Sequence, residues 1–95
     1  MALLDLLGRR WALRVLWELR GEALQFRALQ ERCGGVSSSV LNGRLGELRA
    51  AGIVAREDGG YALSAEGREL LAGLEPLHAF SERWAAGAVK PRASA

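Results

Sequence analysis

Apolar residues recur at helical spacing through most of the chain, and glycines interrupt them. Over residues 2–20 they repeat every three or four positions, which predicts helix, and Gly8 either divides this stretch into two helices or bends one. Similar spacing predicts a short helix over 25–32. Leucines at 41, 45 and 48 predict a third helix over about 38–51, with Ser37 as its N-cap. The first half of the chain is therefore predicted to be helical.

The second half opens with a hairpin pattern. The β-prone runs Ile53–Arg56 and Tyr61–Leu63 flank the turn Glu57–Gly60, and an Asp-Gly pair in such a turn is a strong hairpin signal. A long helix over about 65–86 follows, with Ser64 as its N-cap. Proline has no amide hydrogen, so this helix could kink at Pro76.

The order of elements predicts a mainly α fold with a small β-hairpin, an α+β arrangement. Ala23 and Leu24 could add a stub of strand. Two short helices joined by a glycine-containing turn, then a hairpin, are typical of a winged helix-turn-helix. Because 95 residues are too few for two cores, we expect one domain over residues 1–87 and a frayed or disordered tail over 88–95.

The chain lacks the marks of several other classes. It has no apolar run near 18 residues, so no membrane span or membrane partner is predicted. Its start has no positive region typical of a signal peptide, and a cytoplasmic location is expected. One cysteine and one histidine cannot form a four-ligand zinc site, and no metal or other cofactor is predicted. No nucleophile with an acid or base partner and no phosphate-binding loop is recognisable, so we do not expect an enzyme.

The charge balance says little about partners by itself. Thirteen basic and eleven acidic residues give a formal net charge of +2. This excess is too small to predict nucleic-acid binding without support from the fold.

Four segments together resemble a known family. They are Leu6-Leu7-Gly8-Arg9-Arg10-Trp11, Gln25-Phe26-Arg27-Ala28-Leu29, Val36–Leu48 followed by Gly52-Ile53-Val54, and Tyr61-Ala62-Leu63-Ser64-Ala65-Glu66-Gly67. In order and spacing, from about residue 3 to residue 86, they resemble the HxlR-type winged helix-turn-helix regulators, which are close to the MarR-like proteins.

The resemblance implies a cytoplasmic, dimeric, DNA-binding regulator. In such proteins the first and last helices form the dimer, the third helix enters the major groove, and the hairpin lies along the DNA backbone. Some members sense oxidants or electrophiles through a cysteine near the start of the first helix. This chain has no cysteine there. It departs also at its acidic hairpin tip, at Gly43 and Gly46, and at Gln25, where arginine is usual.

The third helix and its neighbours supply the candidate DNA contacts. With the leucines inward, Ser39, Gly43 and Gly46 face outward, and Asn42 could pair with adenine. Arg44 lies toward one side and could meet phosphate or an acidic neighbour. The predicted DNA-binding residues are Gln25, Arg27, Ser37, Ser38, Ser39, Asn42, Arg44 and Arg56.

Each of these residues also has an ordinary structural interpretation. Ser37–Ser39 could merely cap the helix, Arg27 could pair with Glu31 four residues on, and Arg56 could be a solvated charge. Cys33, beside two turn glycines, could be an exposed, oxidisable thiol or simply packed.

Three tryptophans in so short a chain are the other unusual feature. With neighbouring residues they predict a dimer interface or core, or a pocket for a small aromatic effector. The set is Trp11, Trp17, Leu77, His78, Phe80 and Trp84.

These observations favour a homodimeric transcription regulator, a repressor that binds a pseudo-palindromic operator in double-stranded DNA and is released by a small-molecule effector. The alternative is a winged-helix domain that mainly binds a small aromatic ligand or a protein partner, with little DNA binding. The acidic residues Glu57 and Asp58 and the glycines on the third helix motivate this alternative.

Overall fold

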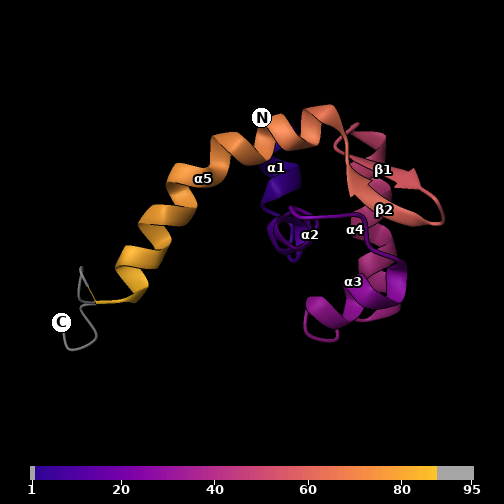
Figure 1. Ribbon diagram of the computed structural model, residues 1–95, viewed down its shortest axis with the longest axis horizontal. Coiled ribbons are helices and arrows are strands. Elements are labelled where there is room, and N and C mark those ends of the chain that lie inside the picture. The colour runs from indigo at the N-terminus through magenta and orange to yellow at the C-terminus, as the bar shows by residue number, and fades with distance from the viewer. Residues whose placement is uncertain (1, 88–95) are drawn as a thin grey trace.

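The computed structural model describes residues 2–87 and confirms a winged helix-turn-helix (Figure 1). Its elements, in chain order, are α1 (Ala2–Leu7), α2 (Ala12–Glu18), α3 (Phe26–Arg32), α4 (Ser38–Ala50), β1 (Val54–Glu57), β2 (Gly60–Leu63) and α5 (Ala65–Ala85). The two strands form one antiparallel sheet. The predicted tail over 88–95 lies outside the described residues. Within the described part of the chain, no helix is long and apolar enough to cross a membrane.

The first helical stretch is divided into two helices at residues 8–11. Gly8 and Arg9 close the end of α1 with bonds to Leu4 and Leu6. Trp11 then adopts a left-handed conformation, with φ of 79°, immediately before α2. Because that conformation is rare for a bulky side chain, the chain turns here and cannot continue as one helix.

The core forms around the inner face of α4. Leu41, Leu45 and Leu48 are buried at the predicted spacing, and α4 packs against α2 and β1. Burying each leucine side chain stabilises the fold by about 1.5–3 kcal/mol. On α2, Val15 and Leu16 complete this contact and are fully buried. The opposite side of α4 is left facing solvent.

The hairpin turns through Asp58 and Gly59, both with positive φ. Such a two-residue turn matches the twist of the flanking strands, which confirms the Asp-Gly signal. Tyr61 and Leu24 exchange backbone hydrogen bonds of 2.8 and 2.9 Å, so the predicted strand stub is a single bridge at Leu24.

A close backbone contact joins the hairpin to α5. The Ser64 amide donates to the Ile53 carbonyl at 2.9 Å, and the Ser64 hydroxyl caps α5 by accepting from the Gly67 amide at 3.0 Å. Gly67 is buried against the same Ile53 carbonyl, where a Cβ would collide with the oxygen. The absence of a side chain at Gly67 therefore allows the first turn of α5 to sit on the end of the hairpin.

The far half of α5 extends away from the rest of the protein (Figure 1). The helix continues through Pro76 without a break and follows an arc. Its first half packs Leu70 and Leu71 against the core. Its second half exposes Leu77, Phe80 and Trp84, whose exposed fractions are 58%, 49% and 44%.

Two glycines of α5 should respond in opposite ways to alanine. Gly67→Ala should destabilise the protein by about 1–3 kcal/mol, because the new methyl group overlaps the Ile53 carbonyl. Gly73→Ala, in the same helix, meets no neighbour and should stabilise it by about 0.5–1 kcal/mol, because alanine loses less backbone entropy. Urea unfolding followed by circular dichroism measures both. A Gly67→Ala variant as stable as Gly73→Ala would contradict this packing.

Candidate nucleic-acid interface

The solvent-facing side of α4 is small and polar. Residues 38, 39, 42, 43 and 46 are all exposed, opposite the buried leucines. No hydrogen bond or ion pair within the described residues engages the side chains of Ser39 and Asn42. This face can approach another molecule closely, because Gly43 and Gly46 add no bulk to it.

Two serines at the start of α4, Ser37 and Ser38, have structural partners. Ser37 is the N-cap of α4 and accepts a hydrogen bond from the Val40 amide at 3.2 Å. Gln30 donates one bond to the Val36 carbonyl at 2.8 Å and another to the Ser38 hydroxyl at 3.2 Å. Gln30 thereby fixes the turn between α3 and α4. The capping interpretation is confirmed for Ser37, and Ser39 and Asn42 are exposed side chains of α4 that make no hydrogen bond within the described residues.

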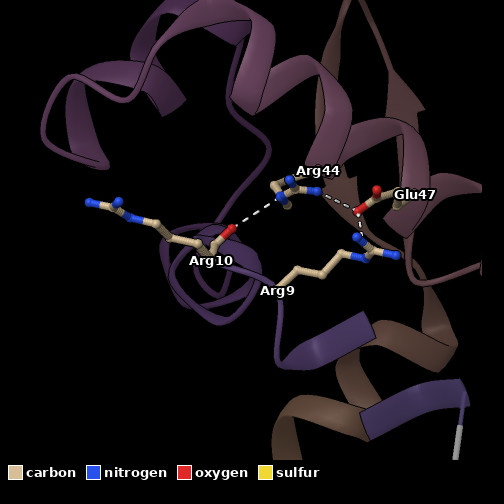
Figure 2. Close-up of polar contacts among 4 residues, drawn as sticks. All are labelled: Arg9, Arg10, Arg44 and Glu47. Carbon is tan, nitrogen blue, oxygen red and sulfur yellow. Dashed lines mark hydrogen bonds and ion pairs between the residues drawn. The ribbon is translucent and has the colours of Figure 1, made fainter. Parts of the chain in front are cut away.

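Arg44 points away from the exposed face and toward α2 (Figure 2). Its Nε donates to the Arg10 carbonyl at 3.0 Å, and a terminal nitrogen lies 2.7 Å from a Glu47 carboxylate oxygen. The side chain is only 20% exposed. Of the two partners predicted for Arg44, the structure shows the acidic neighbour.

Three other predicted contacts lie at the surface. Gln25 is exposed at the N-terminal boundary of α3, and Arg27 is exposed in its first turn. The described residues contain no ion pair between Arg27 and Glu31, so that alternative is not observed. Arg56 lies over the Tyr61 ring at 4.8 Å and donates to the tyrosine hydroxyl at 3.1 Å. This contact presents a guanidinium on the side of the hairpin, behind its acidic tip.

One exposed arginine escaped the sequence analysis. Arg49 lies in the last turn of α4 and is exposed. It stands seven positions after Asn42, two helical turns along the same side, and that spacing is the signal that could have identified it. Arg49 therefore adds a positive charge at the C-terminal end of the polar face of α4.

A separate apolar groove of about 370 Å³ lies between α2 and α5. It is within the size range of small-molecule sites, about 300–1,000 Å³. Trp17 and His78 both line it and contact each other directly, with ring centroids 4.0 Å apart and ring planes tilted by 36°. The remaining lining residues are Leu13, Arg14, Leu16, Leu71, Leu74, Glu75, Leu77 and Ser81.

The structure brings together only half of the predicted aromatic set. Trp17, Leu77 and His78 line the groove, but Trp11, Phe80 and Trp84 do not. Trp11 sits at the start of α2, partly buried against the core. Phe80 and Trp84 lie on the far half of α5, exposed and outside the groove. Within one protomer these residues do not form a single pocket, because helical phase and the length of α5 separate them. A pocket that they form at the junction of two protomers stays a prediction.

Cys33 is buried and not an exposed thiol. Loss of hydration raises the pKa of the Cys33 thiol above its ordinary value, an effect that the nearby Arg14 partly offsets. Because the thiolate is the reactive form, both burial and the raised pKa protect this cysteine from oxidants.

These features are those of one family of regulators. The model of the HxlR-like helix-turn-helix family matches residues 6–88. The chain belongs to the HxlR-like helix-turn-helix family. It is accordingly a DNA-binding transcriptional regulator and not an enzyme. Comparison with curated protein sequences gives no match.

Solved structures of three other proteins share the fold. Quinone-bound YodB from B. subtilis is 28% identical, with a TM-score of 0.79 over 86% of this chain and 93% of YodB. A possible HxlR family transcriptional factor from Thermoplasma volcanium is 26% identical, with a TM-score of 0.82 over 90% and 83% of the two chains. A MarR-family protein from Porphyromonas gingivalis, 16% identical, shares the fold with a TM-score of 0.77 over 85% and 86%.

Proposed function

We propose that this HxlR-family regulator is a homodimeric repressor that occludes a pseudo-palindromic operator. The observation that carries the proposal is the solvent-facing side of α4, where polar and small residues lie opposite three buried leucines on a rigidly packed helix. In a helix-turn-helix this helix enters the major groove, where side chains meet base edges. Asn42, which can bond adenine in two places, and Ser39 are the proposed base contacts.

Arginines around this face supply the phosphate contacts. Arg27 on α3, Arg49 on α4 and Arg56 on the hairpin are exposed. Phosphate contacts position a protein on DNA, whereas base contacts select the sequence. The tip residues Glu57 and Asp58 are exposed and would be repelled by phosphate. We therefore expect the side of the hairpin at Arg56, and not its tip, to approach the backbone.

The dimer is proposed from the apolar residues that the single chain leaves exposed. On α5, the apolar stripe that packs Leu70 and Leu71 into the core continues into Leu77, Phe80 and Trp84, which are exposed. On α1, Leu3 and Leu4 are exposed as well. Exposed apolar surface of this extent, on helices at the edge of a small domain, favours association with a second copy. Two copies of α4 would then address two half-sites about one helical turn apart.

The groove at Trp17 and His78 supports a small aromatic effector. YodB, which shares this fold, has been solved with a bound quinone. The groove here is lined mainly by leucines, with Trp17 and His78 at one side, and such a lining suits a planar, weakly polar molecule. Because Cys33 is buried and its thiol pKa is raised, binding would be reversible and not a covalent adduct. Ligand and dimer surfaces share α5, so an effector there could change the dimer and release DNA.

DNA recognition is tested with the duplex recovered by selection from a randomised pool. Asn42→Ala should cost about 1–3 kcal/mol of binding and relax the preference at one base pair of each half-site. Arg27→Ala and Arg56→Ala should instead weaken all sequences alike, each lowering the salt dependence by about one counterion. Arg32→Ala, at the other end of α3, removes the same charge and should leave that slope unchanged. Selection that yields no motif would support ligand or partner binding as the main function.

The dimer is tested by mass in solution. Sedimentation should give twice the 10.2 kDa of the chain for the natural protein. Phe80→Ser combined with Trp84→Ser should shift it to the monomer, because both exposed apolar side chains on α5 are lost. Ala79→Ser, exposed on the same helix, is the control and should remain dimeric. A natural protein that sediments as a monomer would reject the proposed assembly.

The effector site is tested with 2-methyl-1,4-naphthoquinone as the probe. Calorimetry should show saturable binding, and intact mass should show no adduct. Trp17→Ala should weaken binding by about twofold to tenfold, because the groove loses its indole, and this loss is typical of one aromatic contact. Trp84→Phe, outside the groove, should bind as the natural protein does. Equal binding by Trp17→Ala would exclude this groove.

A further inference from the structure

Arg44 links the recognition helix to the chain segment between α1 and α2. Its guanidinium donates to the Arg10 carbonyl at 3.0 Å and to the Glu47 carboxylate at 2.7 Å (Figure 2). The first of these bonds joins positions 34 residues apart in the sequence. Arg44 is half-buried on α4, whereas Arg49 on the same helix is exposed. The two arginines of one helix thus have different environments.

Arg9 closes the same network from the other side. Its Nε lies 3.7 Å from the Glu47 oxygen that Arg44 also contacts. Residues 9 and 10 are consecutive, so α4 holds the segment by one side chain and by the neighbouring backbone carbonyl. Glu47 is flanked by two guanidinium groups, which offsets a negative charge that would otherwise stand at the edge of the DNA-binding face.

Apolar packing holds part of this segment, because Leu7 is buried and Leu6 and Trp11 pack against the core. Arg44 adds a polar contact from α4 to the backbone of the segment. The backbone hydrogen bonds described at residues 8–12 run only to positions within four residues, such as Gly8 to Leu4 and Ala12 to Arg9. Such bonds shape the turn but do not orient α1 relative to α4. Trp11, directly after the Arg10 carbonyl, holds a left-handed conformation that costs energy for a non-glycine residue. A turn of this kind persists when surrounding contacts hold it, and Arg44 supplies one of them.

We infer that Arg44 is a positioning residue that sets the angle between the recognition helix and the α1 arm of the dimer. The inference rests on the proposed homodimer, in which α1 contributes Leu3 and Leu4. If α1 meets the partner, the orientation of α4 relative to α1 sets the distance and rotation between the two recognition helices. Adding or removing one base pair between the half-sites rotates one half-site relative to the other by about 36°. Arg44 therefore determines which half-site spacing the dimer accepts.

The bridge requires arginine in particular. A guanidinium presents several N–H donors in a fixed planar fork, so it can bond a carbonyl and a carboxylate at once. The ammonium of lysine keeps the charge but cannot reproduce that fork. Arg44→Lys thus separates the bridge from the charge, because a simple phosphate contact survives the substitution and the bridge does not.

The first test compares affinities for three duplexes. Each carries the selected half-site as an inverted repeat, at the preferred spacing or with one base pair added or removed. The natural protein should favour the preferred spacing. Arg44→Lys and Arg44→Ala should reduce that preference by about threefold to thirtyfold, the range typical of residues that couple two sites. Arg49→Lys and Arg49→Ala, on the same helix, should keep it.

The second test needs no DNA. Hydrogen exchange should be at least about threefold faster at the hydrogen-bonded amides of Arg9 and Ala12 in Arg44→Lys than in the natural protein, because the segment loses its link to α4. Exchange at the buried centre of α4 should be unchanged, which excludes general unfolding. If Arg44→Ala fails to fold, both tests are made with Arg44→Lys and Glu47→Gln.

The outcomes separate this role from the proposed function. Unchanged spacing preference and unchanged exchange in Arg44→Lys would overturn the positioning role while the homodimer stands. A second outcome would also overturn the positioning role: Arg44→Ala loses the same affinity on all three duplexes, while Arg44→Lys keeps full affinity. Arg44 would then be a phosphate contact. A natural protein without any spacing preference would overturn the homodimeric function itself, and the spacing role with it.

Discussion

The packing of one face of α4 is the constraint on which the rest of this structure depends. Leu41, Leu45 and Leu48 are buried against α2 and the start of the hairpin, which fixes both the position and the rotation of the helix. Rotation matters as much as position, because only one side of a helix can meet the edges of DNA bases at a time. Because the leucines are buried in the core, the helix cannot rotate about its axis, and Ser39 and Asn42 face solvent.

The total charge of the chain favours DNA binding only slightly, and the positions of its charged residues matter more. The net charge of +2 is small for a DNA-binding protein. Arg27, Arg49 and Arg56 are exposed around the polar face, whereas Glu47 is flanked by Arg9 and Arg44. Most of the remaining acidic charge near the interface is at the hairpin tip. A DNA interface of this kind gains less from general attraction to phosphate and depends more on the geometry of a few contacts.

The long last helix connects the surfaces that regulation would use. Its first turn sits on the Ile53 carbonyl through the close approach of Gly67, its middle lines the groove with His78, and its end exposes Phe80 and Trp84. One continuous helix thus carries the packing contact, one wall of the groove and the exposed aromatic residues. A molecule in the groove would therefore lie between the DNA-binding domain and the proposed dimer surface. The buried Cys33 lies outside that groove, which favours reversible recognition over thiol chemistry.

Local signals in the sequence were enough to determine the elements and the fold class. Ser37 and Ser64 cap the helices they were expected to cap, and Asp58-Gly59 forms the expected turn, because each depends on bonds within a few residues. The polar face of α4 followed in the same way from its leucine spacing. The family resemblance rested on these same segments.

Only the tertiary structure decided which residues meet across the fold. One of the two partners of Arg44 is a carbonyl 34 residues away, and backbone carbonyls carry no sequence signal. The separation of Trp17 from Trp11 and Trp84 depends on how α2 and α5 are rotated and how far α5 extends. The burial of Cys33 likewise depends on the helices that pack over the turn. Contacts of this kind arise from packing between elements, which the periodicity within each element does not specify.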